Sequence, residues 1–152
     1  MHLAHYLTLL ERSQRNLAAG FRAVGEAHVA DADIAITCAK LARQCDGHAE
    51  QLAPFAGRYG EDAPAEPERL HGEPFAGTRE GGLGLLRDLH DLYLMACECD
   101  IVWTLVGQAA QGARDKELLT LVQSCEGETA IQLSWLSGRM KQAAPQALVV
   151  AR

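Results

Sequence analysis

Residues 34–59 read IAITCAKLARQCDGHAEQLAPFAGRY, and their apolar positions recur at alternating steps of three and four residues. This spacing keeps one stripe of an α-helix facing a partner helix. The stripe consists of Ile34, Cys38, Leu41, Cys45, His48, Leu52, Phe55 and Tyr59. Cys45 and His48 therefore point toward a core, where polar groups are costly unless they have partners.

Three further stretches, at about 3–29, 83–113 and 116–143, show the same helical spacing. Polar residues interrupt each of their apolar stripes: Gln14 in the first, Asp100 in the second, Thr129 and Gln132 in the third. The stripe of the stretch at 83–113 runs through Leu86, Leu89, Tyr93, Ala96, Asp100, Trp103, Gly107 and Ala110. We expect Pro145 to end the last helix, because proline lacks the N–H that a helix interior needs.

The connections between these four helices are short, long and short. Short loops predict that the first two helices, and the last two, form antiparallel hairpins. The middle connection, at about 61–81, can reach ~65 Å when extended, which exceeds the ~40 Å length of a 27-residue helix. The sequence therefore predicts one domain over 1–152. Its fold is all-α, an up-down-down-up four-helix bundle with one long crossover between helices 2 and 3.

Composition narrows the classes of partner. The chain has 152 residues, is 48% hydrophobic, and carries a formal charge of −6 without a basic run. Nucleic acid is not an expected partner, because phosphate binding needs clustered Lys and Arg. A membrane is not expected either, since no apolar stretch approaches the ~20 residues of a span.

The five cysteines lie inside helical patterns rather than loops. An odd number of such cysteines favours reduced thiols, so we expect a cytoplasmic protein. The N-terminus also lacks the pattern of a secretory signal. Thiolates could hold Cu(I) or Zn(II), but buried free cysteines more often pack as small hydrophobes.

Counting outward from the two hairpin turns brings the polar residues to one level of the bundle. Gln14 comes level with Cys45, and Asp100 comes level with Thr129. Matching the two hairpins then places His48 with Gln132. A polar layer across the middle of the bundle follows.

This layout resembles the ferritin-like superfamily, including bacterioferritin and rubrerythrin relatives, over almost the whole chain. The resemblance implies a di-iron or di-manganese centre held by a Glu from each of two helices and a Glu-x-x-His from each of the other two. The positions that correspond are Gln14 or Glu11, Cys45 to His48, Asp100 or Glu98, and Thr129 to Gln132. In the strict register only His48 and Asp100 have side chains of the imidazole or carboxylate type that bind such metals.

Such a centre needs about six carboxylate or imidazole ligands, so we do not expect intact di-iron. A slipped register would add carboxylates. The candidate metal ligands are then His48, Asp100, Glu11, Glu98, Glu126 and Glu128, with Gln14, Cys45, Thr129 and Gln132 as neighbours.

Two hypotheses follow. In the first, the chain is a ferritin-like protein of binding or scaffolding role whose polar layer is structural, with Asp100 orienting His48 and no cofactor or catalytic residue. In the second, it is a metal-dependent oxidoreductase or metal sensor with a single Fe, Mn or Zn. Whether it is an enzyme stays open. We expect a homodimer, and an apolar tail at about 144–152 that packs on its own bundle or on a partner.

Overall fold

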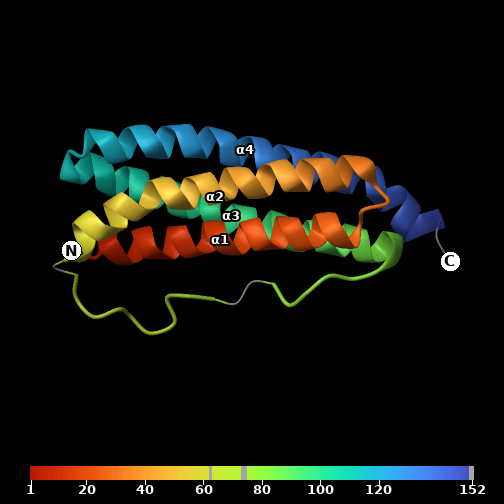
Figure 1. The fold of residues 1–152 in the computed structure, drawn as a ribbon, viewed down its shortest axis with the longest axis horizontal. Helices are drawn as coiled ribbons and strands as arrows, with labels where there is room; N and C mark the ends of the chain where they lie inside the picture. The colour runs from red at the N-terminus through yellow and green to blue at the C-terminus, as the bar shows by residue number, and fades with distance from the viewer. Residues whose placement is uncertain (62, 73–74, 151–152) are drawn as a thin grey trace.

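Four long helices make up most of the chain in a computed structural model that describes residues 1–61, 63–72 and 75–150 (Figure 1). The helices are α1 (Leu3–Ala27), α2 (Ala32–Gly60), α3 (Gly81–Ala113) and α4 (Lys116–Pro145). They confirm the predicted all-α four-helix bundle with a long connection between helices 2 and 3. The predicted crossover and tail include 62, 73–74 and 151–152, which lie outside the described residues.

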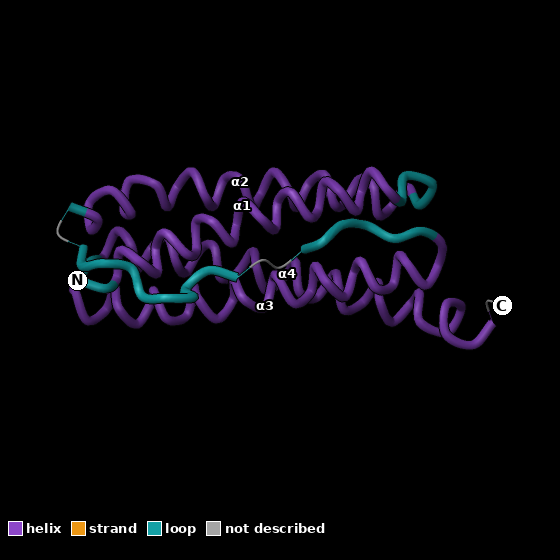
Figure 2. The backbone as a smooth tube through the Cα atoms, turned by 90° about the horizontal axis from the view of Figure 1, so that it is seen from below, coloured by secondary structure: helices purple, strands orange, loops and turns teal. Residues whose placement is uncertain are grey.

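The helices pack as two hairpins that meet side by side. α1 contacts α2 and α3, and α4 contacts α3 and α2. In Figure 1, α1 and α4 run in one direction along the bundle, whereas α2 and α3 run in the other. Helices 2 and 3 can share a direction because the connection between them runs the length of the bundle, as Figures 1 and 2 show.

The connection rests on the bundle through apolar anchors. Leu70 and Phe75 are partly buried and pack against the core. At its end, the backbone of Arg79 lies so close to Gly84 that a Cβ on residue 84 would come within 2.9 Å of the Arg79 carbonyl carbon. A glycine is therefore required where the connection meets the first turn of α3.

The core follows the predicted stripes on α1 and α2 but not on α3. On α3, Leu85, Leu92 and Cys99 are buried, whereas the predicted Leu86, Tyr93 and Asp100 are only partly buried. Leu89, Ala96 and Trp103 belong to the core as predicted. Because α3 contacts both α1 and α4, it buries two adjacent apolar stripes, and a single seam describes only one of them.

The helix ends differ in how they are capped. The Asp115 carboxylate accepts the Leu118 N–H at 3.0 Å and so caps α4, and the Tyr59 hydroxyl donates to it at 2.8 Å. Asp31 holds the N-cap position of α2 without a side-chain cap hydrogen bond. Its carboxylate lies 3.8 Å from the Arg139 guanidinium instead.

Pro145 is the last residue of α4, as predicted, but the chain stays helical beyond it. α4 includes Pro145 and continues as one π-helical segment, η1 (Gln146–Val150). The segment contacts both α3 and α4, although Leu148, Val149 and Val150 stay exposed. No helix among the described residues is long and apolar enough to cross a membrane.

Candidate functional site

A buried histidine lies at the centre of the polar layer. His48 is only 2% exposed, and both its ring nitrogens face side-chain oxygens. Nδ1 lies 3.3 Å from Gln14 Oε1 on α1, and Nε2 lies 3.1 Å from Glu128 Oε2 on α4. The indole of Trp103 on α3 meets the imidazole edge-to-face, with ring centroids 5.8 Å apart. One side chain on α2 thereby contacts all three other helices.

The protonation state of His48 follows from its surroundings. Burial lowers its pKa below the ordinary value of 6.5, and the hydrogen bond and negative charge of Glu128 oppose that shift. Glu128 is 41% exposed, so water screens its carboxylate. We therefore treat the ring as neutral near pH 7, with Nε2–H donating to Glu128.

A neutral ring also decides the orientation of Gln14. With the proton on Nε2, Nδ1 is an acceptor and needs a donor opposite it. In the recorded orientation Gln14 presents its oxygen there, and its buried Nε2 finds no hydrogen-bond partner among the described residues. A half-turn of the amide exchanges the two atoms, so that Gln14 Nε2 can donate to His48 Nδ1. Trp103 Nε1 is likewise buried without a partner in the described part of the chain.

A second set of polar contacts joins α2 to α4 beside His48. Gln132 Nε2 donates to Gln44 Oε1 at 2.7 Å, and the Cys45 Sγ lies 3.8 Å from Gln132 Oε1. Burial raises the pKa of the Cys45 thiol to about 12, so it stays protonated and a poor metal ligand. The Thr129 hydroxyl donates a hydrogen bond to the backbone carbonyl of Cys125 at 2.8 Å. Each of these positions therefore has a structural partner.

The remaining predicted ligands lie apart from His48. Glu11 pairs with Arg15 on the surface of α1 at 3.0 Å. Glu126 accepts a hydrogen bond from Thr104 at 3.2 Å, and Asp100 accepts one from the same hydroxyl through its backbone carbonyl. Glu98 is half-buried on α3. Of the five other predicted ligands, only Glu128 is a hydrogen-bond partner of His48 in the described structure, and the expected Asp100 contact is not formed.

This donor set does not fit a di-metal centre. Such a centre needs about six carboxylate or imidazole ligands that converge. Across residues 1–61, 63–72 and 75–150, no group of three or more His, Cys, Asp or Glu side chains is placed to hold a metal ion. Among the predicted ligands that the structure describes, only His48 and Glu128 converge, as a pair. The amides of Gln14 and Gln132 occupy positions where the ferritin-like pattern has metal ligands.

A second buried histidine, not predicted to be part of any site, lies at one end of the bundle. His28 Nε2 lies 2.8 Å from the Asp88 carboxylate, which is fully buried. Arg79 donates to Asp88 from its backbone N–H at 3.0 Å and from Nη1 at 2.8 Å. Arg79 also contacts Asp91 at 2.8 Å. We call His28, Arg79 and Asp88 the clasp, because they join α1, the long connection and α3.

One sequence signal could have revealed the clasp. Asp88 lies three residues after Leu85 and four before Leu92, on the second buried stripe of α3. A charged residue on an apolar stripe requires a partner of opposite charge. The predicted single stripe through Leu86 and Leu89 leaves Asp88 outside the predicted core. Its partner His28, at the C-terminal end of α1, is buried as well.

The fold and site together define a four-helix bundle with buried His–carboxylate pairs. No known protein family, curated protein or solved structure matches the chain. The function is therefore argued from the site itself.

Proposed function

We propose that the chain is a ferritin-like bundle whose polar layer is structural. Gln14, His48 and Glu128 form a hydrogen-bonded network at the level where metal-binding members of that superfamily hold their di-metal centre. On this proposal the protein is not a catalyst. It acts as a binding or scaffolding bundle in the cytoplasm, where its five free cysteines stay reduced.

The observation that carries this proposal is the engagement of both ring nitrogens of His48. A metal ligand must offer a nitrogen lone pair to the ion. Here Nδ1 faces the Gln14 side chain at 3.3 Å and Nε2 faces Glu128 at 3.1 Å. A network of this kind fixes the register of three helices, because shifting any one of them by a turn would leave buried polar groups without partners.

The direction of the helices supports the ferritin-like assignment. A full-length connection between helices 2 and 3 makes α2 and α3 parallel, which is the up-down-down-up order of that superfamily (Figure 1). The contacts of Cys45, Thr129 and Gln132 favour a structural role over metal binding. They occupy ligand positions and all have contacts inside the bundle.

A second candidate function is a metal-dependent oxidoreductase or metal sensor. The pair of His48 Nε2 and Glu128 Oε2, 3.1 Å apart, favours it, because Glu128 is open enough to admit an ion from solvent. Asp100, Glu11, Glu98 or Glu126 would have to move to complete a site for one Fe, Mn or Zn. Catalytic zinc sites, for comparison, use about three protein ligands.

Elemental analysis separates the two candidates. The protein is purified without chelator or immobilised nickel, loaded anaerobically with Fe(II), Mn(II) or Zn(II), desalted, and assayed for metal per chain. His48→Gln is compared with His90→Gln, which alters an exposed histidine on α3. We expect no stoichiometric metal in any of the three proteins.

About one ion per chain that is lost only in His48→Gln would establish the second candidate. About two Fe or Mn per chain would contradict the structural proposal outright and restore di-metal chemistry.

A further inference from the structure

An exposed apolar stripe runs along the outer face of α3. Leu94, Ile101 and Leu105 are 54%, 54% and 45% exposed. Their spacings of seven and four residues keep them on one face of the helix. On α2 and α4, by contrast, Ile36 and Ile131 are the sole large apolar residues that are exposed among the described positions. Single exposed hydrophobes are ordinary, but a contiguous stripe marks an interaction surface.

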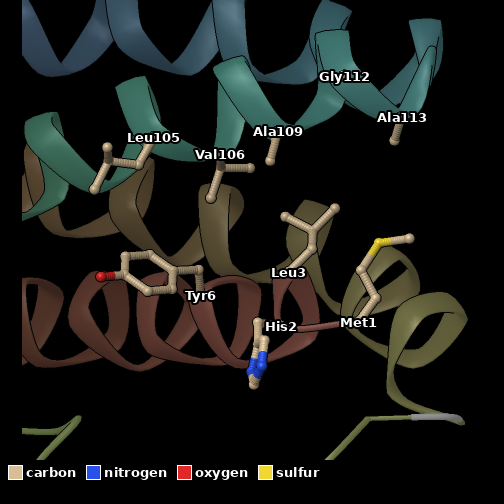
Figure 3. A pocket seen from close by; sticks show the side chains of 9 residues that line it. All are labelled: Met1, His2, Leu3, Tyr6, Leu105, Val106, Ala109, Gly112 and Ala113. Atoms are coloured by element: carbon tan, nitrogen blue, oxygen red, sulfur yellow. The ribbon is translucent and has the colours of Figure 1, made fainter.

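A groove lies beside one end of this stripe, between the start of α1 and the end of α3. Its volume is about 570 Å³, and its lining is mainly apolar (Figure 3). On the α3 side the lining includes Ala109, Gly112 and Ala113, whose small side chains leave the groove open. Leu3 and Tyr6 form the α1 side. The stripe thus has large side chains toward its start and a hollow of small residues toward its end.

This arrangement is self-complementary under a two-fold axis. With the axis across α3 at the level of Trp103, Leu94 of one chain comes opposite Gly112 of the other, and Ile101 comes opposite Leu105. Each chain would place Leu94 at the hollow of its partner, the isologous contact that two-fold dimers use. In the same register Glu98 faces Gln108, which can donate to it. We propose that a second copy of this chain covers the stripe and the groove.

Area and charge favour this occupant. Tyr6, Leu94, Ile101 and Leu105 are each more than a third exposed. With the mouth of the groove they form an apolar centre, to which polar flanking residues would add toward the ~800 Å² per partner of a standard interface. The segment from Leu94 to Leu105 holds two acidic residues, Glu98 and Asp100. In this register Glu98 faces the neutral amide of Gln108, and Asp100 comes level with Val106. Two chains of charge −6 can therefore meet here without like charges in contact.

Sedimentation velocity across a concentration series tests the proposal. We expect the wild-type chain to be a dimer at micromolar concentration, and Leu94→Glu to weaken dimerisation at least ~30-fold, the effect of a hot-spot residue. The matched control is Ile131→Glu, which adds the same charge at a more exposed residue away from the stripe and should leave the dimer intact. Far-UV circular dichroism checks that both variants fold.

A wild-type chain that stays monomeric would overturn the proposal, and so would a Leu94→Glu variant that dimerises normally or an Ile131→Glu variant that dissociates equally. The register has its own test. In a Cys97→Ser background, Glu98→Cys with Gln108→Cys should form disulfide-linked dimers on mild oxidation. Glu98→Cys with Gln123→Cys, which moves the second thiol to an exposed site on α4, should not. Equal cross-linking of the two pairs would overturn the register.

Discussion

The middle and one end of the bundle each bury a histidine against a carboxylate, but the two carboxylates are compensated in different ways. At the middle, His48 lies between the Gln14 amide and Glu128, whose side chain is 41% exposed. At the end, His28 contacts Asp88, which is fully buried and compensated by Arg79. The middle therefore relies on hydrogen bonds and partial hydration, whereas the end relies on a full positive charge.

The difference shows what each cluster can tolerate. A buried carboxylate without its cation is costly, so the clasp depends on every member. A neutral imidazole beside an amide costs less to disturb, because no full charge is stranded. Loss of the clasp would also release the point where the long connection meets α3, whereas loss of His48 would loosen the register of three helices. Three predictions test this contrast, from the largest effect to the smallest.

Removal of the clasp carboxylate should have the largest effect. Asp88→Ala leaves His28 without its partner and frees Arg79 from its main contact, so we expect the free energy of unfolding to fall by about 3 kcal/mol. Denaturant unfolding measures it. The control is Asp46→Ala, which breaks the half-exposed pair with Arg22 and should cost about 1 kcal/mol or less. Equal losses in the two variants would refute the distinction.

His48→Ala should cost about 2 kcal/mol, because it leaves a cavity and removes the partner of the buried Gln14 amide. A double-mutant cycle with Gln14→Ala should give a coupling of about 1 kcal/mol, since the two side chains share one hydrogen bond. A cycle between His48 and Asp88 should give no coupling, because the clusters have no common partner. Coupling between His48 and Asp88 as large as that within the layer would mean that the two regions form one network.

The smallest effect is the pH dependence of the layer. Because burial lowers the folded-state pKa of His48 below 6.5, the unfolded chain takes up the proton first as the pH falls. The stabilisation by neutral His48 is therefore complete above 6.5 and is lost as the pH falls through the folded-state pKa. Wild type should lose more stability than His48→Gln between about pH 8 and about pH 5. Parallel curves for the two proteins would show that His48 does not titrate as proposed.

The sequence predicted the helices well, because long amphipathic stripes report directly on burial. The stripe of α2, from Ile34 to Leu52, matches the observed core. The crossover between helices 2 and 3 was predictable from the number of residues between the two helical stretches. The prediction failed on α3, because a helix with two packed neighbours buries two stripes. A prediction with one stripe leaves the buried residues Asp88 and Cys99 outside the core.

The same choice explains the errors at the site. Asp100 lies on the stripe chosen for α3 but is only half-buried, so it does not contact His48. Glu128 was named only as a slipped-register candidate, one residue before Thr129, yet it is the carboxylate that contacts His48. Periodicity gives a helix face to within about one residue, and a hydrogen bond requires better than that. The contact between α1 and α3 at the clasp joins residues sixty positions apart, which no local pattern encodes.

The most direct test of the account is the unfolding free energy of the wild-type chain with and without excess Fe(II), Mn(II) or Zn(II), measured anaerobically. A structural layer binds no ion in the folded state, so the account predicts the same unfolding free energy in each case. An ion bound at His48 would stabilise the fold by about 2.7 kcal/mol at a hundred times its Kd. A gain of that size, absent in His48→Gln, would contradict the account and establish a metal site in the middle of the bundle.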